Sequence, residues 1–234
     1  MLGVFARVYA INLPSRKDRR LQVITELRSL GVSFRPGHVE LLEAVRPEAT
    51  DGFPTIAERG CFLSHVSAVR NAQMAGVETV LILEDDVRFT PAMRSHGERM
   101  LQELASRDWD IAFLGHGGPP LQNPDFTWHP LTDRGFGTHC YAVHRRVFAR
   151  LLNYMDAVAH RPPGHPEGGR MNVDAVYSMF CALHPDVKAV QAQPTLAIQR
   201  SSPSDISPQW FDHTPGLLHV ARMARVLRSG FRKG

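Results

Sequence analysis

The sequence lacks long apolar runs. None of its 234 residues lies in a stretch that approaches the roughly 20 consecutive apolar residues of a membrane-spanning helix. The apolar start MLGVFARVYAINL has neither a positively charged beginning nor a plausible cleavage site, which favours a strand over a signal peptide. With 43% hydrophobic and 21% charged residues, the composition is typical of a globular domain with one substantial core.

Cysteine is also scarce. Cys61, Cys140 and Cys181 follow no metal-binding spacing, and an odd number of thiols without an export signal indicates reduced cysteines. We therefore expect a cytoplasmic protein, with Cys61 as a core residue.

Basic residues exceed acidic ones by four, and the excess lies near the two ends of the chain. The basic residues do not alternate with stacking aromatics, so we expect no nucleic-acid partner. Residues 216–234 alternate basic and apolar side chains and form an amphipathic tail. Such a tail could rest on an anionic membrane surface at the inner face of the membrane, or pack as an ordinary surface helix.

Strand-like and helix-like segments alternate along the chain, which predicts an α/β fold with a mainly parallel central sheet flanked by helices. We expect a single domain over residues 1–215, a functional loop at 116–137 and a flexible loop at 160–170. Ser15 is the predicted cap of a first helix that turns Leu21, Ile24, Leu27 and Leu30 inward and ends at Gly31. The predicted strands are 4–12, 38–45, 77–86, 109–115, 138–143 and 187–192, and the other helices are 56–75, 91–106, 145–158 and 172–180.

The acidic triplet Glu84–Asp86 follows the apolar run VLIL. Adjacent carboxylates repel one another unless water screens them or a cation binds them. If the extended backbone continues to Asp86, Glu84 and Asp86 share one face and Asp85 takes the other. Such an acid-x-acid pair at a strand end suits manganese or magnesium, although a solvated strand end gives the same pattern.

The segments INLPSRKDRR (11–20), ERGCFLSH (58–65) and LILEDD (81–86) occur in an order and spacing that resemble glycosyltransferase family 25. This family includes bacterial lipooligosaccharide galactosyltransferases and the collagen galactosyltransferases. The resemblance continues through GTHCYAVHRRVFARLL (137–152), NVD (172–174) and PTLAIQRSSPSDIS (194–207). Ala57 and Arg59 depart from the family pattern around Glu58.

The resemblance implies a GT-A-like nucleotide-sugar transferase fold, a UDP-sugar donor and a Mn²⁺ (or Mg²⁺) cofactor. It implies that Asp86 is the direct metal ligand together with Glu84, while Glu84 or Asp85 faces the donor ribose. It further implies that Asp174 is the catalytic base. On the donor-binding side it implies Asn12, Leu13, Arg16, Arg19 and His65.

Each of these residues also has an ordinary structural interpretation. Asn12 suits a turn, and Arg16 and Arg19 suit a solvated helix start. His65 suits a hydrogen-bonded helix interior, and Asp174 complements a helix dipole. The sequence alone leaves these alternatives open.

The predicted function is a metal-dependent inverting glycosyltransferase that moves galactose from a UDP-sugar to a saccharide or glycolipid acceptor, as in lipooligosaccharide or other surface glycan synthesis. Two alternatives remain: a metal-dependent hydrolase of nucleotide-sugars or phosphates, and a non-catalytic nucleotide-sugar-binding module. A hydrolase would release free sugar without an acceptor, and a binding module would bind UDP without turnover.

Overall fold

The computed structural model describes residues 1–117, 125–131 and 137–200. Met1–Gln199 form one compact unit, which contains every element discussed below. The tail at 216–234 lies outside the described residues, so the tail and the domain end at residue 215 stay predictions.

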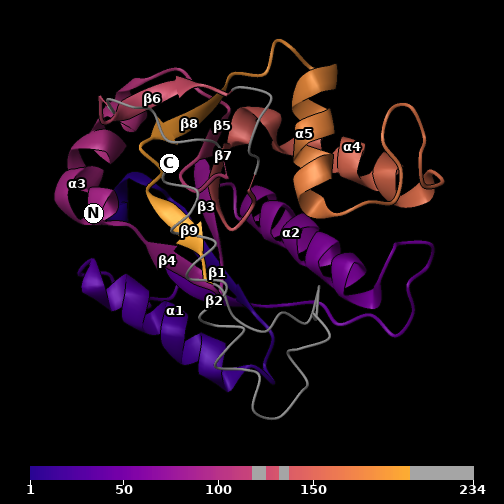
Figure 1. Cartoon of the computed structure of the whole chain (residues 1–234), viewed down its shortest axis with the longest axis horizontal. Helices are drawn as coiled ribbons and strands as arrows, with labels where there is room; N and C mark the ends of the chain where they lie inside the picture. Colours follow the sequence, from indigo (N-terminus) through magenta and orange to yellow (C-terminus); the bar gives the residue numbers. More distant parts are fainter. Residues whose placement is uncertain (118–124, 132–136, 201–234) are drawn as a thin grey trace, which may run out of the picture. The chain divides into compact units, whose positions relative to one another are not determined.

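A seven-stranded sheet forms the centre of this unit (Figure 1). The strand order is β2-β1-β3-β7-β5-β8-β6. Strands β2, β1, β3, β5 and β8 run parallel, while β7 and the edge strand β6 run the opposite way. The predicted α/β fold with a mainly parallel sheet is confirmed. The strands are β1 (Arg7–Asn12), β2 (Val39–Glu43), β3 (Thr79–Glu84), β5 (Ile111–Phe113), β6 (Thr127–Pro130), β7 (Cys140–His144) and β8 (Ala189–Gln193).

Five α-helices cover the sheet in the described part of the chain: α1 (Lys17–Ser29), α2 (Ile56–Met74), α3 (Pro91–Ser106), α4 (Phe148–His160) and α5 (Val173–Leu183). Short 3₁₀ helices span Leu2–Val4 and Arg145–Val147. The side chains of Thr55, Thr90 and Asn172 cap α2, α3 and α5 by accepting a backbone N–H. No helix in the described residues is both long and apolar enough to cross a bilayer.

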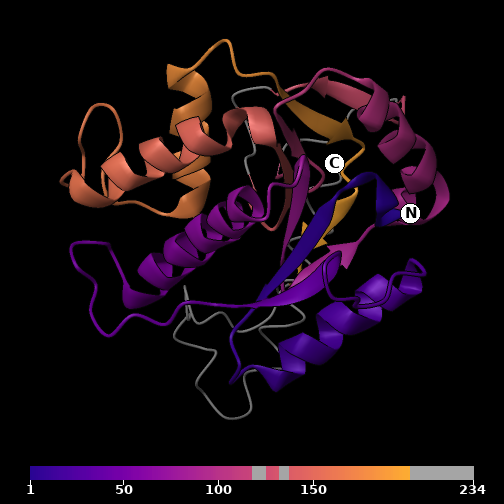
Figure 2. The same cartoon turned by 180° about the vertical axis from the view of Figure 1, so that it is seen from behind.

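The helices form two layers, one on each face of the sheet (Figures 1 and 2). Val8 and Ala10 of β1 pack with α1 and α3, whereas Tyr9 and Ile11 pack with α2, α4 and α5. Because side chains alternate along a strand, successive residues of β3 and β7 also pack alternately into these two cores. Burial on both faces accounts for the near-continuous apolar runs of these strands.

The first helix differs from its prediction. It begins at Lys17 with Arg16 as an N-cap residue that makes no side-chain cap, rather than with Ser15. Leu27 and Leu30 are buried, but Leu21 is 65% exposed, and Val23 and Glu26 are buried in its place. A row of residues spaced by three drifts around a helix of 3.6 residues per turn, so Leu21 and Leu30 cannot share one face.

The predicted loop at 116–137 is also partly wrong, because β6 lies inside it and pairs with β8. Pro130 ends this four-residue strand, and proline is tolerated there because β6 is an edge strand. A second, two-stranded sheet pairs β4 (Val87–Phe89) with β9 (Ala197–Gln199). In the predicted loop at 160–170, His160 still belongs to α4, and residues 161–170 contain no helix or strand.

Candidate functional site

The site lies at the edge of the sheet where parallel strands end. Ile11 of β1 is in register with Glu84 of β3, so Asn12 and the acidic triplet are neighbours. The extended backbone stops at Glu84, and Asp85 and Asp86 form the turn into β4. The prediction that Glu84 and Asp86 share one face required an extended backbone up to Asp86, and the turn removes that requirement's basis. Asp85 and Asp86 both approach Arg19 of α1, whereas Glu84 approaches His65 of α2.

Asp85 is held by two donors. Asn12 Nδ2 donates to one of its oxygens over 2.7 Å, and Arg19 Nη1 donates to the other over 3.2 Å. Burial raises the pKa of Asp85, and the contacts with Asn12 and Arg19 partly offset that effect. Because Asn12 Nδ2 also lies 3.2 Å from the Arg16 carbonyl, this amide ties the start of α1 to the acidic turn.

Asp86 is only 4% exposed, but it accepts fewer hydrogen bonds from the described residues than Asp85 does. Gln199 Nε2 donates to Oδ2 over 3.1 Å, and Arg19 Nη1 lies 3.6 Å from the same oxygen. Among the described residues Oδ1 is buried without a hydrogen-bond partner. Burial and the charge of Glu84 raise the pKa of Asp86 to about 7. A divalent cation would satisfy Oδ1 and offset this repulsion, so the residues present fit a hard metal ion.

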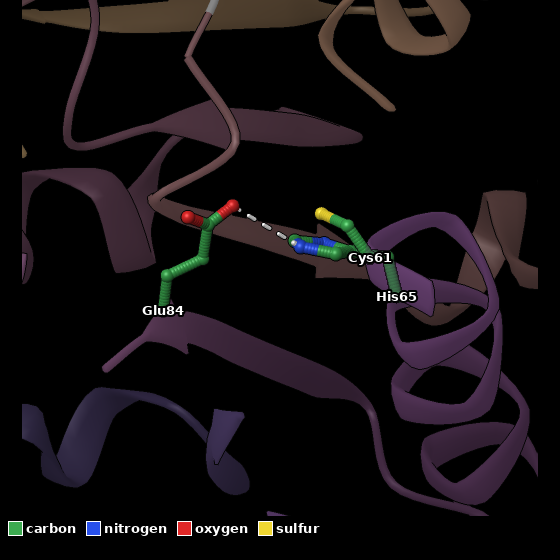
Figure 3. A group of neighbouring side chains, drawn as sticks. All are labelled: Cys61, His65 and Glu84. Carbon is green, nitrogen blue, oxygen red and sulfur yellow. Dashed lines mark ion pairs between the residues drawn. The ribbon is translucent and has the colours of Figure 1, made fainter. Parts of the chain in front are cut away.

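Glu84 belongs to a buried chain of polar side chains that runs toward α5. Its Oε1 lies 3.3 Å from His65 Nε2 (Figure 3). His65 Nδ1 lies 2.8 Å from the Tyr141 hydroxyl, to which the Tyr177 hydroxyl donates over 2.8 Å. Burial alone would raise the pKa of Glu84, but His65, His139 and Arg19 together lower it. Glu84 is thus held as a carboxylate.

Asp174 lies at the first turn of α5 and is exposed. Its Oδ1 accepts from the backbone N–H of Thr138 over 2.9 Å and from the Thr138 hydroxyl over 2.5 Å. Thr138 immediately precedes His139, whose carbonyl accepts from the Glu84 backbone N–H. Asp174 also lies close enough to Cys61 to raise the pKa of that thiol. Asp174 is therefore on the same side of the sheet edge as Glu84.

The other residues predicted to bind the donor are Leu13, Arg16 and Arg19, and their surroundings differ. Arg16 forms a two-pronged ion pair with Asp18, over 3.0 and 2.9 Å, which lowers the pKa of Asp18 to about 2. Leu13 is half-buried directly after β1. Arg19 contacts the carboxylates of Asp85 and Asp86, and the donor-binding roles of Arg16 and Arg19 stay predictions.

Three residues of the site were not predicted from sequence as site residues. Gln199 reaches Asp86 only because β9 pairs with β4, and two three-residue strands give no clear sequence pattern. Thr138 and His139 immediately precede β7, whose start lies at this edge because that strand is reversed. The signal that could have indicated them is the family-like segment that begins at Gly137.

Comparisons with known proteins agree with the predicted family. The model of Glycosyltransferase family 25 (LPS biosynthesis protein) matches residues 5–119. A human protein named inactive glycosyltransferase 25 family member 3 is 32% identical over 96% of this chain and 43% of its own length. Mouse procollagen galactosyltransferase 2 is 24% identical over 92% of this chain and 37% of its own length. The chain thus spans less than half the length of these relatives.

A solved structure supports the fold. The crystal structure of a glycosyltransferase involved in the glycosylation of the major capsid of PBCV-1 superposes with a TM-score of 0.51 at 10% identity. The superposition covers 84% of this chain and 94% of that one. The sequence matches confirm the family that the motifs predict: residues 5–119 belong to glycosyltransferase family 25, and curated members of that family align along most of the chain.

Proposed function

We propose that this chain is a metal-dependent inverting glycosyltransferase that moves a sugar, with galactose as first choice, from a UDP-sugar to a saccharide or glycolipid acceptor. The family supports glycosyl transfer, and the procollagen galactosyltransferase relatives support galactose. The observation that carries the proposal is the buried, unbonded Oδ1 of Asp86 beside Glu84, at the carboxyl ends of parallel strands. In open α/β sheets this edge is where ligands bind.

Asp86 and Glu84 are the residues that would hold Mn²⁺ or Mg²⁺. When bound, such an ion supplies positive charge that stabilises the departing diphosphate. Glu84 is suited to this role because its pKa is lowered, so that it is ionised at neutral pH. Asn12 and Arg19 hold Asp85 and thereby fix the turn that presents Asp86.

Asp174 is the proposed base. Its carboxylate takes the proton of an acceptor hydroxyl while that oxygen attacks the anomeric carbon and the bond to UDP breaks. The exposure of Asp174 gives an acceptor access, and the two bonds from Thr138 orient the carboxyl group. A direct displacement of this kind inverts the anomeric configuration.

Acceptor class and location belong to the same proposal. A glycolipid acceptor at the cytoplasmic face of a membrane, as in lipooligosaccharide synthesis, would suit the basic tail at 216–234.

Turnover of UDP-galactose with Mn²⁺ tests the proposal. We expect Asp174→Asn to lower kcat by about 10²- to 10⁴-fold, the usual contribution of a general base. Asn can still accept from Thr138, so the local structure is kept. We expect Asp86→Asn to lose most of the turnover as well. Asp186→Asn is the matched control, because Asp186 pairs with Arg150 on the surface. Near-wild-type turnover in both site variants would rule out this assignment.

The human relative named inactive favours one second candidate, a domain that binds a nucleotide-sugar without turnover. Such a domain would be stabilised by UDP-sugar and Mn²⁺ but would release neither UDP nor transferred sugar. Measuring thermal stabilisation and UDP release on the same preparation separates the two functions, since ligands that bind the native state raise its apparent stability.

A further inference from the structure

Cys61, His65 and Glu84 converge beside the proposed donor site (Figure 3). Cys61 and His65 are four residues apart on α2 and therefore share one face of that helix. Glu84 enters from the end of β3. One potential ligand atom from each residue lies within 4.8 Å of the other two. The three side chains thus come from two rigid elements of the fold.

The spacing suits a tetrahedral ion. Two N/O ligands bound at about 2.0–2.1 Å in a tetrahedral zinc site lie about 3.3–3.4 Å apart. His65 Nε2 and Glu84 Oε1 are 3.3 Å apart. One ligand atom of each residue lies within 4.8 Å of those of the other two, so the sulfur has to move closer before the three side chains surround one ion.

His65 gives a second observation. Its side chain is completely buried, and Nε2 lies 3.3 Å from Glu84 Oε1 without the geometry of a hydrogen bond. Buried polar atoms of this kind normally have a partner. The other ring nitrogen, Nδ1, lies 2.8 Å from the Tyr141 hydroxyl. A histidine that binds metal through one nitrogen usually has the other held in this way.

We propose that Cys61, His65 and Glu84 form a zinc site, with the Cys61 sulfur, His65 Nε2 and a Glu84 oxygen as ligands and a fourth position open. A thiolate and an imidazole favour zinc, whereas the carboxylate oxygens of Asp86 and Glu84 favour manganese or magnesium. The inference goes beyond the proposed glycosyl transfer and shares only Glu84 with it.

The charges around Cys61 support the site. Burial raises the pKa of this thiol well above its usual range, and the negative charges of Glu84, Asp174, Asp86 and Glu58 raise it further. The same charges attract a dication. When zinc binds, the thiol proton is released to solvent and the sulfur coordinates as thiolate. Cys61 as a whole residue is half-buried.

Cobalt substitution provides a direct test. Co²⁺ is titrated into the reduced, chelator-treated full chain, and the near-ultraviolet sulfur-to-cobalt charge-transfer band is recorded. We expect one equivalent of Co²⁺ to produce the band and Zn²⁺ to abolish it. Cys61→Ser should lose the band. Cys181→Ser, the same change at a half-buried thiol on α5, should keep it. Asp86→Asn should keep it too, because that residue belongs to the other ion.

Absence of the band in the wild-type chain overturns the inference, whatever the variants do. Binding of Co²⁺ without sulfur character also overturns it, since the ion would then lie among carboxylates. Persistence of the band in Cys61→Ser would place the thiolate elsewhere. Circular dichroism confirms that each variant is folded. Absence of the cobalt band would not imply a loss of UDP-sugar turnover, and a loss of turnover would not imply absence of the band. The zinc site and the proposed glycosyl transfer can therefore be refuted separately.

Discussion

Asp85 and Asp86 are adjacent in one turn, yet their surroundings differ. Each Asp85 oxygen has a donor, one from Asn12 and one from Arg19. Among the residues that the structure describes, Asp86 has one hydrogen-bond donor, Gln199, and its Oδ1 has none. Burial raises the pKa of both, but at Asp86 the charge of Glu84 adds to the effect, and the pKa rises to about 7.

This difference indicates that one carboxylate stabilises the turn and the other is available to bind a ligand. A carboxylate with all its donors supplied by the protein has little left to offer a ligand, and removing a donor leaves buried charge unpaired. A buried carboxylate that lacks a donor destabilises the ligand-free fold, and the same oxygen is free to bind a cation. We therefore interpret Asp85 as the structural residue of the turn and Asp86 as the binding residue.

The largest expected effect concerns manganese. At a concentration of one hundred times its Kd, a ligand stabilises the native state by about 2.7 kcal/mol. We expect urea unfolding to show a gain of this order for the wild type with Mn²⁺, little gain for Asp86→Asn, and a gain close to wild type for Asp85→Asn. The reverse pattern, with Asp85→Asn insensitive to Mn²⁺, would exchange the roles of the two residues.

A smaller effect concerns the ligand-free fold at pH 8 with a chelator present. Asp86→Asn removes a buried, poorly paired charge, and we expect the free energy of unfolding to rise by about 1–3 kcal/mol. The folded pKa of Asp86 is raised to about 7 from 3.8, so the native state binds more protons than the unfolded state between those values. Wild-type stability should therefore fall as the pH rises from about 4 to 7, and the advantage of the variant should grow over that window.

The corresponding change on the Asp85 side has the opposite sign. Asn12→Ala removes a donor from buried Asp85, and we expect the free energy of unfolding to fall by about 1–3 kcal/mol. Stability equal to wild type in Asn12→Ala, or a loss of stability in Asp86→Asn, would contradict the comparison.

The smallest expected effect concerns Arg16, beside the turn. Its partner Asp18 is 59% exposed, and exposed ion pairs contribute less than about 1 kcal/mol. We expect Arg16→Ala to unfold almost as the wild type does while the KM for UDP-galactose rises. Asp18→Ala, which removes the same ion pair, should leave that KM unchanged. If both variants raise KM alike, the ion pair rather than the arginine contacts the donor side.

Local patterns predicted much of the fold. The capped helices after Thr55 and Thr90 and the buried strands around Tyr9 and Ile82 follow from cap residues and apolar runs. The edge strand β6 could not be predicted in the same way, because a four-residue strand ending in Pro130 gains its stability from pairing with β8. Such pairing joins distant parts of the chain and leaves almost no local signal.

The site was predicted as a set of residues but not as a geometry. The resemblance placed Asn12, His65, Asp86 and Asp174 near one sheet edge, and the structure brings them there. The alternating-face prediction for the acidic triplet depended on an extended backbone, which a turn replaces after Glu84. Cys61, predicted as a core residue, is half-buried and packs against the core that contains Phe62 and Tyr141.

The reversed direction of β7 has a consequence for how this protein can diversify. Strands β3 and β5 end at the edge of the sheet that holds the candidate site, whereas the antiparallel strand β7 begins there. Thr138 and His139, which directly precede β7, therefore lie at this edge. His139 is wedged between Gly115 and Gly137, where even a methyl group would collide with its ring. A side chain at Gly115 or Gly137 would therefore displace His139 and, through the adjacent Thr138, the Asp174 carboxylate that we propose as the base, so variation at both positions is confined to glycine while this arrangement is kept.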